Sequence, residues 1–192
     1  PRTVYVTVER QIFMRITFVL ADGFSLTGGN RVIAIYAERL QKRGHQVFVV
    51  SSAPAKPTAR QQIRSLLKGQ GWISQPELQP SYFDQLGVPC ILLDRCRPVT
   101  EADVPDADVV IATWWETAKW VMDLSPAKGA KAYFVQHHEV FDYLPQDQTR
   151  ATYSMPLHKI AITKWLVDLM ATEYGDTQVS YVPNSVDAKQ FY

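Results

Sequence analysis

RITFVLADGFSLTGGNRVIAIYAERLQKRGHQVFVVS, residues 15–51, is the stretch that decides the fold of this chain. Short apolar runs at its two ends, 15–21 and 46–51, predict strands that are buried on both faces. Between them apolar residues recur every three or four positions, which predicts a helix over Asn30–Arg43 with Asn30 as its N-cap. Strand, helix and strand at this spacing form a βαβ unit.

The same alternation continues to the end of the chain. It predicts an α/β fold, a doubly wound, mainly parallel, Rossmann-like sheet with helices on both faces. Further strands are expected at 89–94, 107–113, 130–136, 158–163 and 178–182, and further helices at 58–68, 114–124 and 164–174. Between 56 and 87 prolines and glycines are frequent, and we expect a helix, a loop and a short second helix there.

Composition narrows the class of protein and its partners. Of the 192 residues, 46% are hydrophobic and 20% charged, as in ordinary soluble domains. A net charge of +1 produces no overall field that would attract nucleic acid, so no such partner is expected. No apolar stretch is long enough to span a bilayer or resembles a secretion signal, and the two cysteines do not suggest a disulfide framework. We therefore expect a cytoplasmic protein.

Residues 1–13, PRTVYVTVERQIF, stand apart from this pattern. We interpret them as an N-terminal extension and residues 14–192 as one domain. Valines alternate with other residues in the extension, which is typical of a strand. Residues 3–9 could therefore add a strand to a sheet edge, or pair with a second copy to form a dimer. The alternative is a leader that does not belong to the fold.

Ligands of open α/β sheets bind beyond the carboxyl ends of the strands, where the strand order reverses. The loop 22–30, DGFSLTGGN, lies at such an end and finishes in Gly28, Gly29 and Asn30. Glycines let a ligand approach the backbone, and a helix N-terminus attracts phosphate or the polar groups of a sugar. A plain connecting turn is the alternative. The spacing is not GxGxxG, which argues against a dinucleotide site.

Two further loops at predicted strand ends are chemically distinctive. Trp114, Trp115 and Glu116 follow the fourth apolar run, and one of the two indoles is expected to line the ligand cleft, although both could pack against the core. His137, His138 and Glu139 follow the fifth run. A histidine there can donate a hydrogen bond or stabilise developing charge, and structural roles for the histidines remain the alternative. Consecutive residues rarely converge on one ion, so no metal is expected.

Two charged patterns have ordinary explanations. Asp106 and Asp108 spell DxD, a metal-binding pattern, but they open a strand at the amino edge, away from the expected ligand. Arg60, Arg64 and Lys68 recur every four residues on one helix face. Such a row could contact anionic lipid, at the inner face of a membrane, or a phosphorylated acceptor. A solvated helix face is the more ordinary interpretation.

The chain resembles a known family. The resemblance lies in MRITFVLADGFSLTGGNRVIAIYAERLQKRGHQVFVVSSA (14–53), DADVVIATWWETAKWV (106–121), YFVQHHEVF (133–141), KIAITKWLVDLMATEYG (159–175) and VSYVPNSVDAKQFY (179–192). These segments are similar to the N-terminal domain of family-4 retaining glycosyltransferases of the GT-B fold. In the last segment Ser185 stands where glycine is commonest in the family.

This resemblance implies that the domain binds the acceptor, a saccharide or a lipid-linked molecule, while a C-terminal domain, absent here, binds the nucleotide-sugar donor. It also implies transfer with retention, without a metal or other cofactor. Gly28 and Gly29 match the glycine loop near the donor phosphates, and His137 matches a position where many members have a cleft histidine. Because His138 is adjacent, either histidine could be the counterpart. A non-catalytic Rossmann-like module that binds a nucleotide or sugar is the alternative function.

Overall fold

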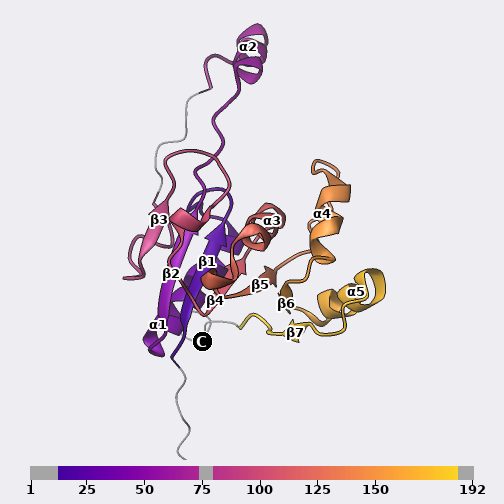
Figure 1. The fold of residues 1–192 in the computed structure, drawn as a ribbon. Helices are drawn as coiled ribbons and strands as arrows, with labels where there is room; N and C mark the ends of the chain where they lie inside the picture. The colour runs from indigo at the N-terminus through magenta and orange to yellow at the C-terminus, as the bar shows by residue number, and fades with distance from the viewer. Residues whose placement is uncertain (1–12, 74–79, 186–192) are drawn as a thin grey trace, which may run out of the picture.

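One seven-stranded sheet organises the chain in the computed structural model, which describes residues 13–73 and 80–185 (Figure 1). The strands are β1 (Arg15–Leu20), β2 (Gln46–Ser51), β3 (Cys90–Leu92), β4 (Val109–Ala112), β5 (Ala130–Val135), β6 (His158–Ala161) and β7 (Ser180–Tyr181). The helices are α1 (Gly28–Lys42), α2 (Ala59–Leu67), α3 (Trp115–Asp123), α4 (Gln146–Tyr153) and α5 (Lys164–Tyr174), with short 3-10 helices η1 (Glu101–Asp103) and η2 (Pro126–Lys128). The strand proposed at residues 3–9 lies outside the described residues.

The strand order is β3-β2-β1-β4-β5-β6-β7, and every pair is parallel. β1 lies between β2 and β4, so the chain winds outward from β1 first in one direction and then in the other. This order confirms the doubly wound, Rossmann-like α/β fold. The reversal between β1 and β4 is the point at which such sheets bind ligands, and it is flanked by the loops that follow β1, β4 and β5.

Two apolar cores lie on opposite faces of the sheet. On one face α1 packs through Ile33, Ala34 and Ala37 against side chains of the strands that point to this face, such as Phe18 of β1 and Phe134 of β5. On the other face α3 and α5 cover a second set that includes Val110 and Val135, and Tyr153 of α4 belongs to the same cluster. Neighbouring residues of one strand thus enter different cores, which explains why the strands are apolar at nearly every position.

α1 begins two residues earlier than the sequence predicts. Its N-cap is Thr27, whose hydroxyl accepts a hydrogen bond from the Asn30 backbone N–H at 3.3 Å. The Asn30 side chain instead donates its amide hydrogens to the carbonyl oxygens of Gly23 (3.3 Å) and Ser25 (3.0 Å). The predicted N-cap therefore holds the preceding loop together, and Gly28 and Gly29 become the first turn of the helix.

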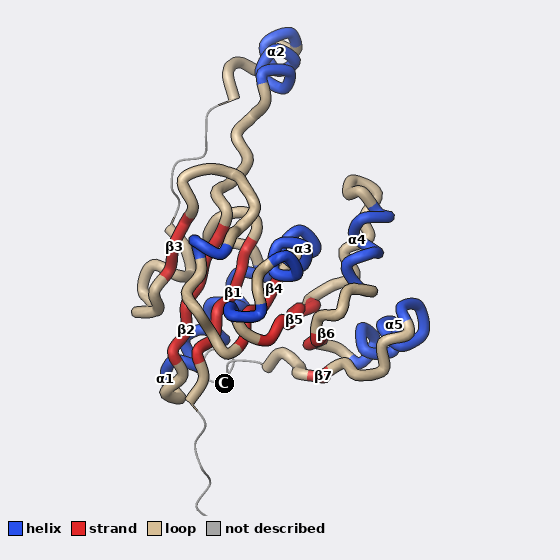
Figure 2. The backbone as a smooth tube through the Cα atoms, in the orientation of Figure 1, coloured by secondary structure: helices blue, strands red, loops and turns tan. Residues whose placement is uncertain are grey.

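Two helices depart from the expected pattern. α4 was not predicted, because it is polar and buries only Thr149, Thr152 and Tyr153. α2 forms as expected, but it projects beyond the carboxyl edge of the sheet instead of covering a face (Figures 1 and 2). The face beside β2 is covered instead by the turn that contains Phe83 and Val88. No second helix occurs among the described residues of the 56–87 stretch.

The DxD carboxylates lie at the amino edge, as predicted. Asp108 precedes β4 and pairs with Arg15 at the start of β1, at 2.8 Å. Asp106 pairs with Lys128 at 2.9 Å. Each carboxylate is thus engaged by a cation at the edge opposite the candidate ligand loops. Both contacts hold the entry of β4 against its neighbours.

Gly129, between η2 and β5, lies in tight contact with the backbone that precedes β4. Its φ is +101°, and a Cβ at this position would lie 2.7 Å from the backbone carbonyl oxygen of Ala107. The close approach lets the Ala130 backbone N–H donate to the backbone carbonyl oxygen of Asp108 at 2.9 Å. This hydrogen bond starts the pairing of β5 with β4. Both the backbone conformation and the packing therefore exclude a side chain here.

We expect Gly129→Ala to lower the free energy of unfolding by about 3 kcal/mol, because it combines strain in φ with a steric clash. Gly175→Ala is the matched control, since Gly175 also has a positive φ, +69°, but has open space around it. That variant should lose only about 1 kcal/mol. Urea unfolding followed by circular dichroism measures both, and equal losses would show that the backbone at Gly129 relaxes away from the clash.

Candidate functional site

Three loops meet at the carboxyl edge of the sheet beside the reversal of strand order. The hydroxyl of Thr113, after β4, donates to the Val19 carbonyl of β1 at 2.8 Å. The Gln136 side chain, after β5, donates to the Gly29 carbonyl of α1 at 3.4 Å. The glycine, tryptophan and histidine loops expected at one site are therefore neighbours. Gln136 was missed from sequence, although it is the first polar residue after a buried strand.

The first turn of α1 is open to a ligand. The backbone N–H groups of Gly28 and Gly29 have no hydrogen-bond partner within residues 13–73 and 80–185, and no acidic side chain lies in this turn. A Cβ on Gly28 would meet no atom within 4 Å, so the fold itself does not require glycine there. Unpaired N–H groups and the positive end of the helix dipole favour an anionic group at this position.

The two tryptophans differ in environment. Trp115 is buried at the start of α3, and its ring lies under the Lys119 ammonium at 5.4 Å. Trp114 is only half-buried and acts as the N-cap residue, with its backbone N–H donating to the Thr117 hydroxyl at 2.9 Å. Trp114 is thus the indole that can reach a ligand, while Trp115 packs in the core. Glu116, the residue after Trp115, is half-buried, and this burial raises the pKa of its carboxyl group.

The adjacent histidines also separate into two roles. His138 is half-buried, its Nε2 lies 2.7 Å from the Tyr174 hydroxyl, and burial lowers its pKa. His137 is exposed, and its Nδ1 lies 2.9 Å from the His138 carbonyl oxygen. Nε2 of His137 has no hydrogen-bond partner among the described residues, so it is the nitrogen that can interact with a ligand. The side chain of His138 instead packs among tyrosines of α4 and α5.

Glu139 is buried, 2% exposed, and does not line an open surface as its sequence position suggests. Its Oε2 accepts hydrogen bonds from the Trp115 backbone N–H at 2.9 Å and from the Tyr133 hydroxyl at 3.0 Å. One carboxyl group therefore joins the histidine loop to the N-terminus of α3 and to β5. Burial raises the pKa of Glu139 to about 8, although both hydrogen bonds oppose the shift.

Tyr153 of α4 completes this support. Its hydroxyl accepts the Glu139 backbone N–H at 2.8 Å and donates to the His137 carbonyl at 3.2 Å. Its ring stacks on Tyr133 at 5.7 Å. Neither tyrosine was identified from sequence. A signal was present for Tyr133, because a hydroxyl in the middle of a buried strand requires a polar partner.

An aromatic group surrounds His137 on the exposed side. Phe141 stacks on the His137 ring at 5.1 Å and on Tyr143 at 5.3 Å, and Trp165 of α5 approaches His137 edge-on at 6.3 Å. Tyr143 is 78% exposed and Trp165 54% exposed. We call these residues, Phe141, Tyr143 and Trp165, the aromatic ledge. Exposed aromatic faces of this kind can stack on the apolar face of a sugar ring. None of the three was identified from sequence.

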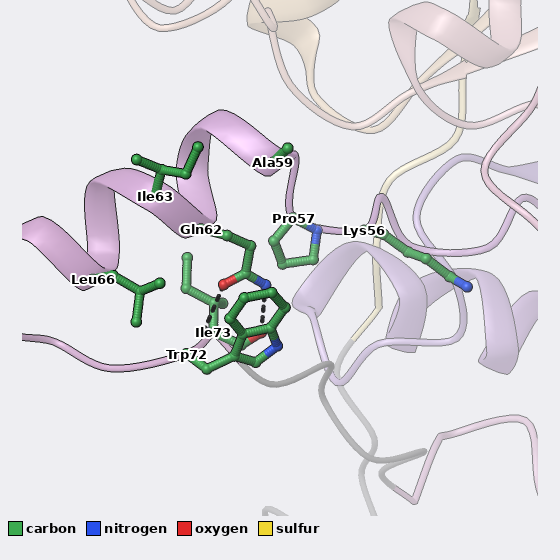
Figure 3. A pocket seen from close by; sticks show the side chains of 8 residues that line it. All are labelled: Lys56, Pro57, Ala59, Gln62, Ile63, Leu66, Trp72 and Ile73. Atoms are coloured by element: carbon green, nitrogen blue, oxygen red, sulfur yellow. Dashed lines mark hydrogen bonds between the residues drawn. The ribbon is translucent and has the colours of Figure 1, made fainter.

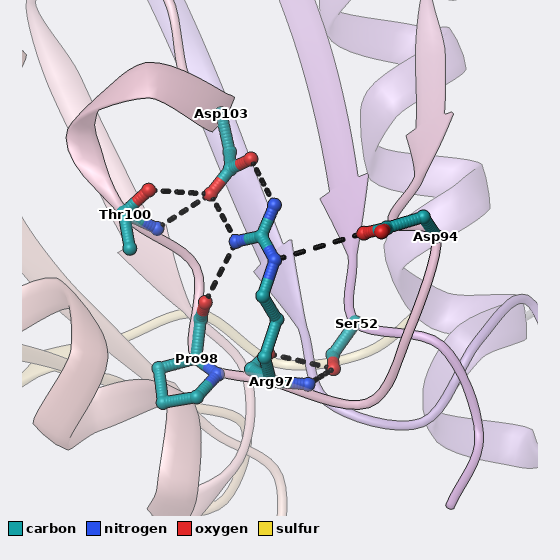
Figure 4. A network of polar contacts seen from close by, with 6 residues as sticks. All are labelled: Ser52, Asp94, Arg97, Pro98, Thr100 and Asp103. Atoms are coloured by element: carbon teal, nitrogen blue, oxygen red, sulfur yellow. Dashed lines mark hydrogen bonds and ion pairs between the residues drawn. The ribbon is translucent and has the colours of Figure 1, made fainter.

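A second polar cluster fixes the loop between β3 and β4 (Figure 4). Arg97 makes a bidentate pair with Asp103, with both N···O distances at 2.7 Å, and this contact holds the pKa of Asp103 well below its usual range. The buried Ser52 hydroxyl, just after β2, donates to the Arg97 carbonyl at 2.8 Å and accepts its N–H at 3.0 Å. All described groups of the cluster are engaged with one another, which indicates a structural clamp.

Comparison with known proteins adds the decisive observation. A family model described as Glycosyltransferase Family 4 matches residues 26–190, which include Gly28, Gly29 and the tryptophan and histidine loops of the site. The chain belongs to glycosyltransferase family 4. Neither the curated proteins nor the solved structures contained a match.

Membership in glycosyltransferase family 4 agrees with the sheet, which has the architecture of one half of a GT-B fold. Within the described residues of this family-4 domain, no helix has the length and apolar character needed to cross a membrane.

We expect the stability of this family-4 domain to depend on the ionisation of Glu139. Its folded pKa of about 8 lies above the ordinary value of 4.5. The stabilising contribution of the protonated carboxyl group is therefore full below pH about 4.5 and is lost as the pH rises through about 8. Glu139→Gln keeps an oxygen that can accept both hydrogen bonds but cannot ionise, so its unfolding free energy should fall less over this range.

Urea unfolding of the parent and of Glu139→Gln, measured at several pH values, tests this expectation, because other titrating groups cancel in the difference. Glu139→Ala should lose about 3 kcal/mol below pH about 4.5, since the Trp115 N–H and the Tyr133 hydroxyl lose their acceptor, and this loss relative to the parent should shrink as the pH rises through about 8. Parallel pH profiles for the parent and the Gln variant would contradict a raised pKa.

Proposed function

We propose that this domain forms the acceptor side of a retaining glycosyltransferase that moves a sugar from a nucleotide-sugar to a saccharide or lipid-linked acceptor. In the reaction the bond between the anomeric carbon and the donor phosphate oxygen breaks, and a bond to an acceptor hydroxyl oxygen forms. The acceptor proton leaves with the diphosphate or passes to a neighbouring base. The domain's part is to position the acceptor and to stabilise negative charge on the leaving group.

The observation that carries the proposal is the open first turn of α1. Gly28 has no steric reason to be glycine, and the N–H groups of Gly28 and Gly29 are unpaired within the described part of the chain. A diphosphate oxygen at this turn would fill the space and accept these N–H groups. Asn30 then contributes indirectly, by holding the preceding loop through its bonds to Gly23 and Ser25.

In the proposal, His137 and the aromatic ledge bind the acceptor and the transferred sugar. His137 is exposed, and its backbone is fixed by Tyr153. Because Nδ1 carries the proton that bonds the His138 carbonyl, Nε2 of the neutral ring accepts a hydrogen bond from a sugar hydroxyl in the proposal, while Trp165 and Trp114 provide faces for sugar rings. His138 and Glu139 position this loop and do not touch substrate.

The remaining donor contacts come, in this proposal, from a second Rossmann-like domain facing the same edge. The side chains of Asp22 and Glu116, which lie near each other at this edge, are acidic and not basic, so the cations that balance the diphosphate have to be supplied by other residues. No metal or other cofactor takes part in the proposed reaction. The proposal includes a cytoplasmic location, with which the two unpaired cysteines, Cys90 and Cys96, agree.

We expect Gly28→Ala to separate activity from stability. The added methyl group meets no protein atom, and alanine favours a helix over glycine by up to about 1 kcal/mol, so the unfolding free energy should stay equal or rise. The same methyl group displaces the donor phosphate, and kcat/KM should fall by roughly 10- to 100-fold. The measurement is sugar transfer by the protein with its donor-binding domain. Unchanged kcat/KM would exclude close approach of a ligand to Gly28.

Isolated residues 1–192 should fold but should transfer no sugar. Without the second domain the donor loses about half of its contacts, and the transition state loses the cations that would stabilise its negative charge. A radiolabel assay with a panel of nucleotide-sugars, run on this chain and on the longer gene product, tests this. The chain alone should retain weak acceptor binding that Trp165→Ala abolishes. Equal turnover by the two proteins would indicate a single-domain enzyme, and inactivity of both would favour a non-catalytic sugar-binding module.

A further inference from the structure

α2 exposes an apolar face that no other part of the described chain covers. Ile63 is 58% exposed, Leu66 51% and Leu67 84%. Trp72, in the segment that returns from the helix, is 69% exposed. Ile63, Leu66 and Trp72, together with Pro57 and Ala59, border an open groove of about 410 Å³, shown in Figure 3. Apolar groups gathered in this way on a soluble domain mark an interaction surface.

The orientation of the helix is inverted relative to an ordinary amphipathic helix. Its buried residues are polar: Gln62 exchanges two hydrogen bonds with the Ile73 backbone, at 2.8 and 2.9 Å, and Ser65 donates to the Gly71 carbonyl at 2.8 Å. Figure 3 shows the Gln62 amide turned toward the return segment, while Ile63 points away from it. Because the inner face is polar and satisfied, the outer apolar face is not left over from incomplete packing on the sheet.

The charge around this face has one sign. Residues 55–73 contain four basic side chains, Lys56, Arg60, Arg64 and Lys68, and no acidic one. All four are exposed, and none has an ion pair or side-chain hydrogen bond in the described part of the chain. On α2, Arg60, Arg64 and Lys68 form a row next to the apolar residues, because they repeat every four positions. The face therefore offers apolar insertion and positive charge together.

We propose that α2 and Trp72 dock this domain on an anionic lipid membrane. The apolar side chains enter the boundary between headgroups and acyl chains, the cationic row contacts anionic headgroups, and Trp72 lies at the interface, where indoles are favoured. This combination of apolar and uniformly basic side chains matches a lipid surface. A protein partner that covered only the apolar residues would leave the four cations unpaired.

Docking also orients the candidate site. α2 follows β2 and extends from the carboxyl edge of the sheet, the edge that carries the glycine and histidine loops (Figures 1 and 2). A membrane at α2 therefore faces the same side of the molecule as His137 and the aromatic ledge. A lipid-linked acceptor could then reach the site without leaving the bilayer. This last step rests on the proposed function, whereas the docking itself does not.

Vesicle flotation of the full chain tests the docking without requiring sugar transfer. The protein should bind vesicles of phosphatidylcholine with phosphatidylglycerol, more weakly with added salt, and should not bind phosphatidylcholine alone. Arg60→Gln/Arg64→Gln/Lys68→Gln should lower the partition coefficient roughly 100-fold, since each cation contributes about a factor of five at an anionic surface. Tryptophan emission should shift to the blue on binding, and Trp72→Phe should remove most of the shift.

Two further variants make the test specific. Leu66→Ser/Leu67→Ser, which alters exposed residues and no charge, should also weaken binding. The matched control, Arg39→Gln/Lys42→Gln/Arg95→Gln, removes three exposed cations elsewhere and should bind like the parent. Three results would overturn the proposal: no binding to anionic vesicles, equal loss in the control, or self-association in sedimentation that Leu66→Ser/Leu67→Ser abolishes. Absence of sugar transfer by the protein with its donor-binding domain, alongside intact vesicle binding, would count against the proposed function alone.

Discussion

Parallel pairing is the constraint on which the rest of this structure depends. A parallel strand has to be followed by a crossover that returns the chain to the amino edge, so the carboxyl ends of all strands, and the loops after them, share one edge. In this order β1 lies between β2 and β4. The loops after β1, β4 and β5 are therefore neighbours although 22–30 and 136–142 are more than a hundred residues apart. The position of the candidate site follows from the winding of the sheet.

Strand order brings these loops together, and buried polar contacts determine their conformation. The Glu139 carboxyl group bonds the Trp115 N–H and the Tyr133 hydroxyl, while Tyr153 holds the backbone on either side of His138. Burying a carboxyl group is unfavourable, and the raised pKa of Glu139 is the consequence. The hydrogen bonds offset part of this cost and fix the backbone of the loop that carries His137. Rigidity of this kind reduces the reorganisation that a transfer reaction requires.

Much of this fold can be predicted from sequence, because strands that are buried on both faces appear as runs of apolar residues. β2, for example, has the predicted bounds, Gln46–Ser51. What could not be predicted depended on partners distant in sequence. Thr27 and Asn30 are both suitable N-caps, and the bonds of Asn30 to Gly23 and Ser25 decide between them. α4 has no apolar periodicity, since it buries two threonines and Tyr153. The three loops are neighbours, as expected from their strand ends, but Trp115 and Glu139 face inward because their partners lie on other elements.

α2 shows why the direction of an amphipathic helix has to come from structure. Its sequence alternates apolar and basic positions in a way that fits either packing on the sheet or projection into solvent. Gln62 and Ser65 decide the matter, because their hydrogen bonds to the return segment turn the polar side inward. Covering the sheet would require these bonds to break and the cations to approach an apolar face, both of which are unfavourable. The Phe83 turn already occupies that face, so the sheet is complete without α2 and the helix remains available at the edge where the ligand loops lie.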